Sequence, residues 1–452
     1  MHKKIVKKGK KLYNACMESG VTEVSYPLTF REEDAKRLGE HLRHRHCVNL
    51  VGMKRVGISN FLRFFLYHKD VATTFISRDE KHVLISVDLN DLVERELYPF
   101  WTLTFKRLVD FSEHSSLSEA TKQKIGNNFL SSIQSQDLFL LIDGIRRSLT
   151  LLVGEGFIPT IFFIRFDRIK ESVTPEFFAN LQGLRDSLHM KLSYVFTSYR
   201  TLDEISPNVF SKASLSVFSH VMYIKPSTAS DLDIISVAYR KRYSITLSDS
   251  LTKQLFSLVS GYVQYLQLAL ILLNERKDES SLTKEQLTEI LTHDERITLQ
   301  SEELWESLTD EEKLLLLKVN NNTTLSENEL KAGAYLKEVG IIIVDGGTHR
   351  IFSELFAHFI NQHVSRSEQQ KKEFAFSKKE NLMFTFLKTK LGEICEREEL
   401  IEEVWPEYQE FGVSDWSIDR LIARVRSKLK EQGSQYEIKT VRTRGYVLIS
   451  KV

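Results

Sequence analysis

The stretch "CVNLVGMKRVGISNFLRFFL" (47–66) decides the fold of the first half of the chain. An apolar run leads to Gly52, four residues separate it from Gly57, and an apolar helical pattern follows Ser59. This is the spacing of the phosphate-binding loop G-x-x-x-x-G-K-[ST], in which backbone N–H groups cradle phosphates and the lysine reaches the outer ones. Position 58, where that lysine belongs, is Ile58. The loop is therefore predicted to keep the backbone of a phosphate site without its main cation.

Apolar runs that predict buried strands alternate with helical patterns between about residues 45 and 225. Short buried strands alternating with helices predict a parallel, doubly wound sheet. A glycine-rich turn after the first strand is where such a sheet binds phosphate, at the N-terminus of the next helix. The predicted strands are 47–52, 82–89, 160–166, 192–198 and 221–226. The candidate nucleotide-binding residues are Gly52, Lys54, Arg55, Gly57 and Ser59.

The order of features over residues 21–365 resembles the STAND and origin-recognition branches of the AAA+ ATPases. The segment "PTIFFIRFDRI" (159–169) stands where the Walker B strand belongs, and "KLSYVFTSYR" (191–200) resembles the strand that carries the first sensor. The segment "SGYVQYLQLALILL" (260–273) resembles the helix of the lid, a small helical domain beside the sheet. The resemblance implies a degenerate P-loop NTPase-like α/β domain (21–226), a helical lid (227–298) and a winged helix of STAND type (299–368).

The catalytic positions of that family are replaced. Aligned on the Walker B pattern, Ile164 takes the place of the magnesium-binding aspartate and Arg165 that of the water-polarising glutamate. Val263 replaces the proline that packs on adenine in STAND proteins. Phosphoryl transfer needs cations at the outer phosphates and a positioned water. The resemblance therefore implies an ATPase-like module without hydrolysis, with no catalytic residue and no metal site assigned.

Whether this loop binds a nucleotide at all stays open at the sequence level. ATP or ADP is one interpretation, as a ligand that is held and not hydrolysed. The alternative is that Lys54 and Arg55 are solvated loop charges.

The segment 374–452 carries the longest ordered set of motifs. These are "REEL" (397–400), "SIDRLIARVRSKL" (417–429) and "TVRTRGY" (440–446). They resemble the C-terminal effector domain of OmpR/PhoB-type response regulators over its whole length, which implies a second winged helix that binds double-stranded DNA. Charge agrees with this interpretation, because residues 378–419 carry 5 basic and 11 acidic side chains and residues 420–452 carry 9 and 2.

The helix predicted over 417–429 has two faces. Apolar residues at helical spacing predict one buried face, and the opposite basic face is suited to the major groove. Arginine guanidinium groups there can bond guanine edges or phosphates. Leu421 stands where many relatives have a histidine that faces DNA. The predicted DNA-binding residues are Ser417, Arg420, Leu421, Arg424 and Lys428 on the helix, with Arg442 and Arg444 on the wing.

Composition places the chain among soluble proteins with substantial cores, at 452 residues and 42% hydrophobic content. The opening segment 1–20 is basic, with six lysines in its first twelve residues, and lacks the apolar core of a signal peptide. No apolar run reaches the ~18 residues that a membrane span needs. Three distant cysteines form no metal or disulfide pattern and fit a reducing cytoplasm. The chain is therefore predicted to be cytoplasmic and to have no membrane partner.

The main hypothesis is a DNA-binding transcriptional regulator whose ATPase-like half senses a signal or assembles, through self-association or an unknown protein partner. The first alternative is a working ATPase that loads on DNA, of the origin-recognition or transposition-helper type. The second is a scaffold in a defence or mobile-element system whose winged helices bind only protein. Basic residues on the predicted DNA-reading helix favour the first two, and Ile58, Ile164 and Arg165 disfavour a working ATPase.

Overall fold

The computed structural model describes residues 22–209, 218, 220–276, 282–369, 376–405, 415–441 and 444–451. The basic segment 1–20 and Arg442 lie outside the described residues. Internal contacts divide the chain into two compact units. The first extends to residue 288 and also includes 325–354, and the second comprises 289–324 and 355–452.

A five-stranded parallel sheet forms the centre of the first unit. Its strands follow the order β2 (Lys81–Asp88), β3 (Phe157–Ile164), β4 (Ser193–Ser198), β1 (Val48–Val51) and β5 (His220–Tyr223). Every neighbouring pair is parallel. The inner strands β1 and β4 are buried along their whole length, as expected where helices cover both faces of a parallel sheet. The predicted parallel α/β fold is confirmed, and each strand lies within three residues of its predicted ends.

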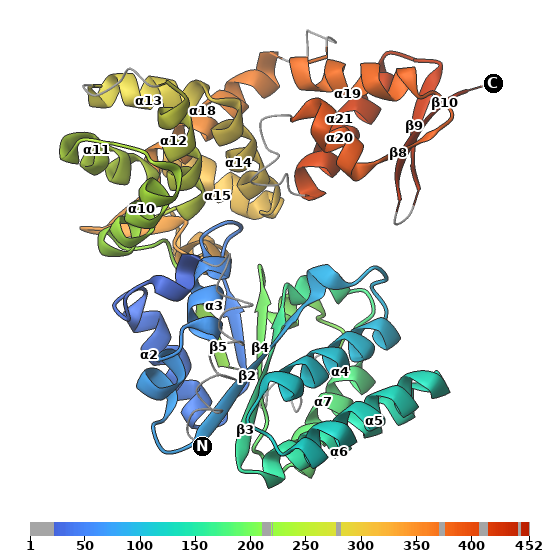
Figure 1. The fold of residues 1–452 in the computed structure, drawn as a ribbon. Coiled ribbons are helices and arrows are strands. Elements are labelled where there is room, and N and C mark those ends of the chain that lie inside the picture. Colours follow the sequence, from blue (N-terminus) through green and yellow to red (C-terminus); the bar gives the residue numbers. More distant parts are fainter. Residues whose placement is uncertain are drawn as a thin grey trace. The chain divides into compact units, whose positions relative to one another are not determined.

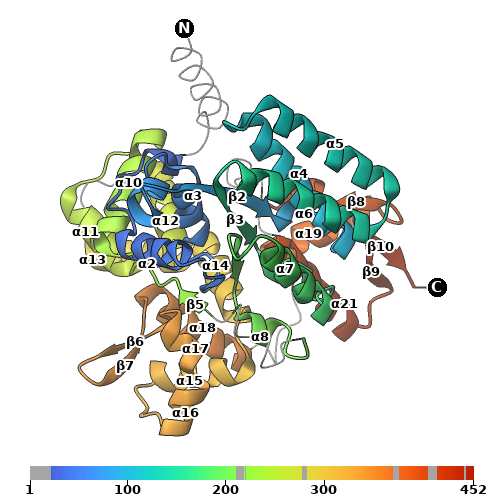
Figure 2. The ribbon, with the colours of Figure 1, turned by 90° about the horizontal axis from the view of Figure 1, so that it is seen from below.

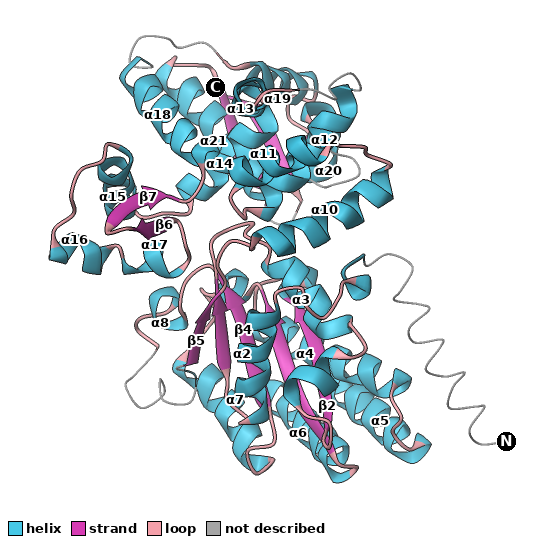
Figure 3. Ribbon diagram, turned by 90° about the vertical axis from the view of Figure 1, so that its left-hand side faces the viewer, coloured by secondary structure: helices cyan, strands magenta, loops and turns pink. Residues whose placement is uncertain are grey.

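Helices cover both faces of this sheet (Figures 1 and 3). Successive side chains of a strand point to opposite faces. Accordingly, the ring of Phe162 packs against Phe65 at 6.2 Å between centroids, and Phe163 packs against Phe100 at 5.0 Å. One face carries α2 (Glu32–Arg43) and α3 (Ile58–Tyr67), and the other carries α4 (Leu97–His114), α6 (Leu138–Gly154) and α7 (Pro175–Ser187). Helix α5 (Glu119–Ser135) packs on α4 and α6.

The segment after the sheet is helical, as the predicted lid requires. Its helices are α10 (Ala229–Tyr243), α11 (Asp249–Val259), α12 (Val263–Arg276) and α13 (Lys284–His293). Shorter elements of the first unit are η1 (Thr22–Ser25), η2 (Ala72–Ile76), η3 (Leu89–Asp91), η4 (Phe166–Ile169) and α8 (Leu202–Ile205).

The segment 299–368 has the order of elements predicted for a winged helix. It contains α14 (Glu295–Glu306), α15 (Asp310–Asn320), α16 (Glu327–Ala332), α17 (Ala334–Glu338), β6 (Ile342–Asp345), β7 (Thr348–Ile351) and α18 (Glu354–Gln369). The β6–β7 hairpin lies beside α17 (Figure 2). The boundary between the two units runs through this segment, since α16, α17 and the hairpin belong to the first and α14 and α15 to the second. The predicted limits 227–298 and 299–368 therefore stay predictions.

The C-terminal segment is a winged helix. It comprises α19 (Lys378–Thr389), β8 (Ile394–Glu396), α20 (Arg397–Val404), α21 (Asp415–Glu431), β9 (Tyr436–Val441) and β10 (Gly445–Ser450), with an antiparallel sheet in the order β8-β10-β9. The apolar face of α21 is buried in its core, together with Trp405 and Tyr446. Gly445 has a φ of +145°, and a Cβ there would come within 2.0 Å of the Cys395 carbonyl oxygen, so only glycine fits where β10 begins.

Candidate nucleic-acid interface and phosphate loop

The glycine-rich loop lies where the sequence predicts it, between the carboxyl end of β1 and the start of α3. Gly57 is the N-cap of α3 with a φ of 109°, a left-handed conformation that favours glycine. Gly52 donates its N–H to the Ser198 carbonyl at the end of β4, at 3.4 Å. Both glycines are buried, and Ser59 is exposed on the first turn of α3. The backbone of a phosphate loop is therefore present.

Side chains of the lid pack directly on this loop. The Tyr262 hydroxyl donates to the carbonyl of Lys54 at 2.6 Å. A Cβ on Gly57 would lie 2.8 Å from Cγ2 of Val263, so the first residue of α12 touches the loop glycine. A buried arginine adds to this packing, because the Arg31 guanidinium donates to the Val56 carbonyl at 3.4 Å. The loop and the start of α12 are therefore in direct contact.

The two replaced Walker B positions lie at the carboxyl end of β3. Arg165 reaches across to β2, where its Nη1 lies 2.5 Å from Asp88 Oδ1. Its backbone N–H donates to Thr197 Oγ1 at 2.9 Å. The Asp88 carboxylate at the end of β2 is thus paired with a guanidinium. Burial raises the pKa of the neighbouring Asp167, against the lowering effects of Lys54 and other cations.

A pocket of about 600 Å³ lies beside α3 at this edge. It is lined by apolar and charged residues of α3, β2 and α4, together with Ile164 and Arg165. The replaced positions border it, so the degenerate edge is accessible to a small molecule. Its polar lining includes Ser59, Arg63, Asp88, Arg107 and Arg165.

The basic face of α21, in the second unit, is paired with carboxylates. Arg420 Nη2 donates to Glu306 Oε1 at 2.9 Å, and Arg424 Nη1 donates to Glu302 Oε1 at 3.0 Å. Both glutamates belong to α14. Lys428 Nζ donates to Glu380 Oε2 of α19 at 2.7 Å. The three predicted DNA-binding cations of α21 are therefore engaged in ion pairs within this unit.

These ion pairs are shielded from water. The side chain of Glu302 is 8% exposed and that of Glu380 is 3% exposed, against 32% for each arginine. Burial raises the pKa of Glu380, but the hydrogen bonds from Lys428 and Ser377 and the charge of Arg424 outweigh it, so the pKa is lowered. We call α14 with this set of pairs the acidic clamp: Glu302, Glu306 and Glu380 against Arg420, Arg424 and Lys428.

Leu421 differs from its prediction as a DNA contact. It is 1% exposed and belongs to the core cluster of the winged helix. Leu299 of α14 packs against the same cluster. Leu421 lies at the border between the apolar and basic faces of α21. In this structure it is a core residue, and its predicted contact with DNA stays a prediction.

The other predicted DNA-binding residues take different positions. Ser417 is half-buried in the first turn of α21, and Arg444 is exposed beside Gly445 at the start of β10. Arg426, which the sequence did not single out, donates to the Ile438 carbonyl at 2.9 Å and to Thr440 Oγ1 at 2.8 Å. It therefore ties α21 to β9 and has a structural role.

Sequence reasoning also missed the acidic side of the clamp. A signal exists, because Glu302 and Glu306 are four residues apart on one helix, and Arg420 and Arg424 are four residues apart on another. Equal spacing lets two helical faces pair residue by residue.

Sequence reasoning also missed a cluster of histidines. Among the residues that the structure describes, His41, His46 and His220 form the one cluster of side chains that could hold a metal ion.

Comparison with known proteins identifies the C-terminal part. Residues 371–448 match the family model described as "Transcriptional regulatory protein, C terminal". The chain therefore carries a C-terminal domain of that family, joined to a P-loop-like α/β module. No curated protein matches the chain.

Solved structures of ATPases resemble the larger part of the chain at low identity. A Walker-type ATPase of Pyrococcus abyssi is 15% identical over 73% of this chain and 95% of its own, with a TM-score of 0.48. The ORC2 protein of Aeropyrum pernix, in ADPNP and ADP complexes, is 11% identical over 75% and 96%, with a TM-score of 0.44. The ORC1 protein of the same organism, in complex with DNA, is 15% identical over 76% and 96%, with a TM-score of 0.38.

Hydropathy adds one finding about membranes. None of the helices that the structure describes combines the length and the apolar character required to cross a bilayer.

Proposed function

We propose that this chain is a cytoplasmic transcriptional regulator that binds double-stranded DNA through α21 and the adjoining wing. The observation that carries the proposal is the match of residues 371–448 to a transcriptional-regulatory family, on a winged helix whose α21 has one apolar and one basic face. Arg420 and Arg424 would contact base edges or nearby phosphates in the major groove. Arg444 would contact phosphate from the wing.

The acidic clamp gives this regulator a closed arrangement. The bonds to Glu306 and Glu302 occupy part of the guanidinium donors of Arg420 and Arg424, and the carboxylates of α14 would repel a nearby phosphate. DNA phosphates and α14 therefore compete for one face of α21. A signal that moves α14 away would raise the affinity for DNA without changing the winged helix itself. This is a population shift between two arrangements, driven by a difference in their contacts.

The α/β module is proposed to sense or assemble and not to hydrolyse nucleotide. Ile58 cannot neutralise the outer phosphates, and the Arg165 guanidinium puts a positive charge where the reaction would need a carboxylate. ATP or ADP stays a candidate ligand, because the loop backbone is intact. Its binding would have to open the contacts that Tyr262 and Val263 make with the loop, which would link nucleotide occupancy to the position of the lid.

A DNA-loading ATPase is the second candidate function, and the combination of phosphate loop, parallel sheet and helical lid favours it. This function requires hydrolysis of ATP, which a regulator that only binds DNA does not. A protein-binding scaffold would bind no DNA at any salt concentration.

Selection of bound genomic fragments with the full chain, followed by anisotropy titration, tests the proposed function. The wild type should bind the selected duplex, and Arg420→Ala with Arg424→Ala should weaken binding, since each lost base contact costs about 1–3 kcal/mol. Lys430→Ala is the matched control, because Lys430 is exposed on the same helix and outside the clamp. Equal binding by the double variant and the wild type, or no binding at low salt, would refute the proposal.

A further inference from the structure

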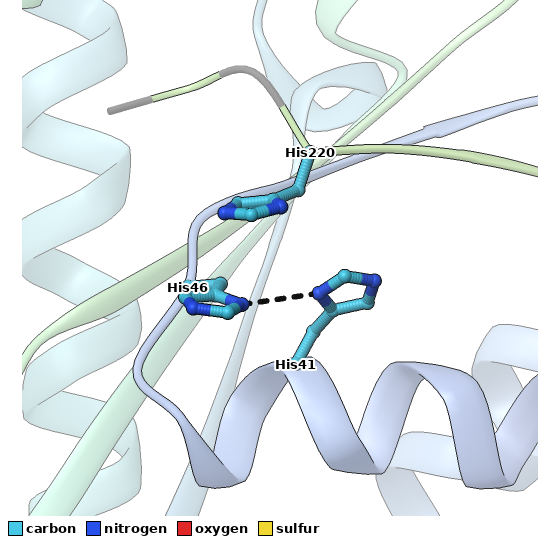
Figure 4. Close-up of side chains that lie close together, drawn as sticks. All are labelled: His41, His46 and His220. Carbon is cyan, nitrogen blue, oxygen red and sulfur yellow. Dashed lines mark hydrogen bonds between the residues drawn. The ribbon is translucent and has the colours of Figure 1, made fainter. Parts of the chain in front are cut away.

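Three histidines meet at the amino-terminal edge of the parallel sheet (Figure 4). His41 lies in the last turn of α2, His46 in the loop before β1, and His220 is the first residue of β5. The pairing of β1 with β5 sets Val48 opposite His220 and so brings the three side chains together. One ring nitrogen of each lies within 4.8 Å of the other two. The phosphate loop follows the opposite end of β1, so this cluster is separate from it.

The spacing of the first pair fits a metal ion. Nδ1 of His41 and Nδ1 of His46 lie 3.2 Å apart. Two nitrogen ligands of tetrahedral zinc, each 2.0–2.1 Å from the metal, are about 3.3 Å apart. The rings of His46 and His220 stack at 4.0 Å with an angle of 14° between their planes. A ring nitrogen coordinates in the plane of its ring, so His220 must turn about its side-chain bonds to share an ion with His46.

The residue type suits such an ion, because neutral imidazole is a common ligand of zinc, copper and nickel. All three side chains are only partly buried, so an ion can reach them from solvent.

We propose that His41, His46 and His220 form a binding site for a divalent transition metal of the zinc type, with water in the fourth position. The ion would join the end of α2 to the starts of β1 and β5. The site is independent of the DNA-binding face of α21, and nothing in the proposed function requires it.

Cobalt(II) is a suitable probe, because a tetrahedral cobalt site absorbs visible light and zinc displaces the ion. The full chain, stripped with a chelator, should bind one cobalt ion with this absorption and lose it to zinc. His41→Gln, His46→Gln and His220→Gln should each weaken binding at least tenfold, because even the loss of an outer-shell partner costs 10–100-fold. His293→Gln is the matched control, since His293 is exposed on α13, outside the cluster, and its Nδ1 bonds the Glu289 carbonyl at 2.8 Å. Its affinity should stay within about twofold of the wild type.

Circular dichroism in the presence of chelator shows whether a substitution disturbs folding. A protection experiment on the wild type tests the site without any substitution. In the wild type, zinc should protect His41, His46 and His220 from diethyl pyrocarbonate and leave His293 reactive. Binding that is unchanged in all three glutamine variants, protection of other histidines only, or no binding at micromolar cobalt would each overturn the proposal.

Discussion

At the scale of single residues, the α/β module differs in charge from the phosphate-loop and Walker B patterns at two positions. A lysine is absent at Ile58, and an arginine is present at Arg165, where it pairs with Asp88. Both changes oppose a magnesium nucleotide at the carboxyl edge of the sheet. The loop glycines have the spacing of the phosphate-loop pattern, and Gly57 has the left-handed φ of 109°. The proposal that the module does not hydrolyse nucleotide depends on the two changed positions, Ile58 and Arg165.

Purified protein should release no phosphate from ATP above a protein-free blank, and Ile58→Lys should not create activity. The added lysine restores one cation, but Ile164 and Arg165 still leave the magnesium ion and the attacking water unplaced. A phosphate-release assay over several protein concentrations measures this. Release that scales with wild-type protein and is lost in Ser59→Ala, whose side chain is exposed, would contradict the prediction.

Arg444→Ala should weaken binding to all DNA sequences alike. A wing residue that contacts phosphate contributes affinity through counterion release, so its loss should reduce the slope of log affinity against log salt by about one. Anisotropy titrations with a selected and a scrambled duplex across a salt series measure both effects. A loss confined to the selected duplex would show instead that Arg444 reads bases.

At the scale of elements, α14 has an acidic face and α21 has a basic face. Glutamates and arginines with equal spacing pair across them, and Leu299 adds an apolar contact with the core of the winged helix. Exposed ion pairs contribute about 0–1 kcal/mol each, and partial burial of both partners makes removal of one partner more costly. The clamp is thus strong enough to hold and weak enough to open.

Glu302→Gln with Glu306→Gln should strengthen DNA binding by the full chain. Glutamine keeps the size of the side chain and removes the charge that competes with phosphate, and a change of about 1–2 kcal/mol corresponds to roughly 5–30-fold in affinity. Glu311→Gln serves as the control, because Glu311 is exposed on α15 and outside the clamp. Unchanged affinity in the double variant would mean that α14 does not compete with DNA.

The first unit should lose stability as pH falls from 7.5 to 5.5. Burial, the largest effect in each case, lowers the pKa values of His41, His46 and His82. The unfolded chain, with histidine pKa values near ~6.5, then takes up protons first. Stability is complete above that value and declines as pH falls toward the folded pKa values. Urea unfolding in chelator at several pH values measures this, and His46→Gln should reduce the slope. A flat or opposite slope would contradict the assignment.

At the scale of the whole molecule, the C-terminal winged helix has a core of its own, and α14, which pairs with its basic face, comes from outside residues 374–452. Among the described residues, Leu299 is the one outside 374–452 that packs against the core cluster of the winged helix. The winged helix should therefore fold without the rest of the chain, which makes its affinity in isolation a direct measure of the clamp.

The fragment 374–452 should bind the selected duplex more tightly than the full chain does. It lacks Glu302 and Glu306, which removes the α14 partners of Arg420 and Arg424, while Glu380 of the fragment stays paired with Arg424. Circular dichroism establishes that the fragment is folded, and a parallel titration compares the two proteins at one salt concentration. A folded fragment that binds less tightly than the full chain would show that α14 assists DNA binding.

The sequence by itself determined the local and periodic features of this protein. Apolar runs of strand length predict all five strands of the sheet, because buried strands must be apolar on both faces. The glycine spacing after β1 predicts the phosphate loop, since only glycine tolerates the φ of 109° at Gly57. The long motifs after residue 374 predict the winged helix and its basic helix.

Only the tertiary structure decided what those features face. The Arg420–Glu306 and Arg424–Glu302 pairs join residues 114 and 122 positions apart, and the Arg165–Asp88 pair joins residues 77 apart. A helical period fixes which residues share a face, but the partner of that face depends on how distant segments pack. For this reason the basic face of α21 was predicted from its sequence, while its cover by α14, the burial of Leu421 and the meeting of three histidines required the folded chain.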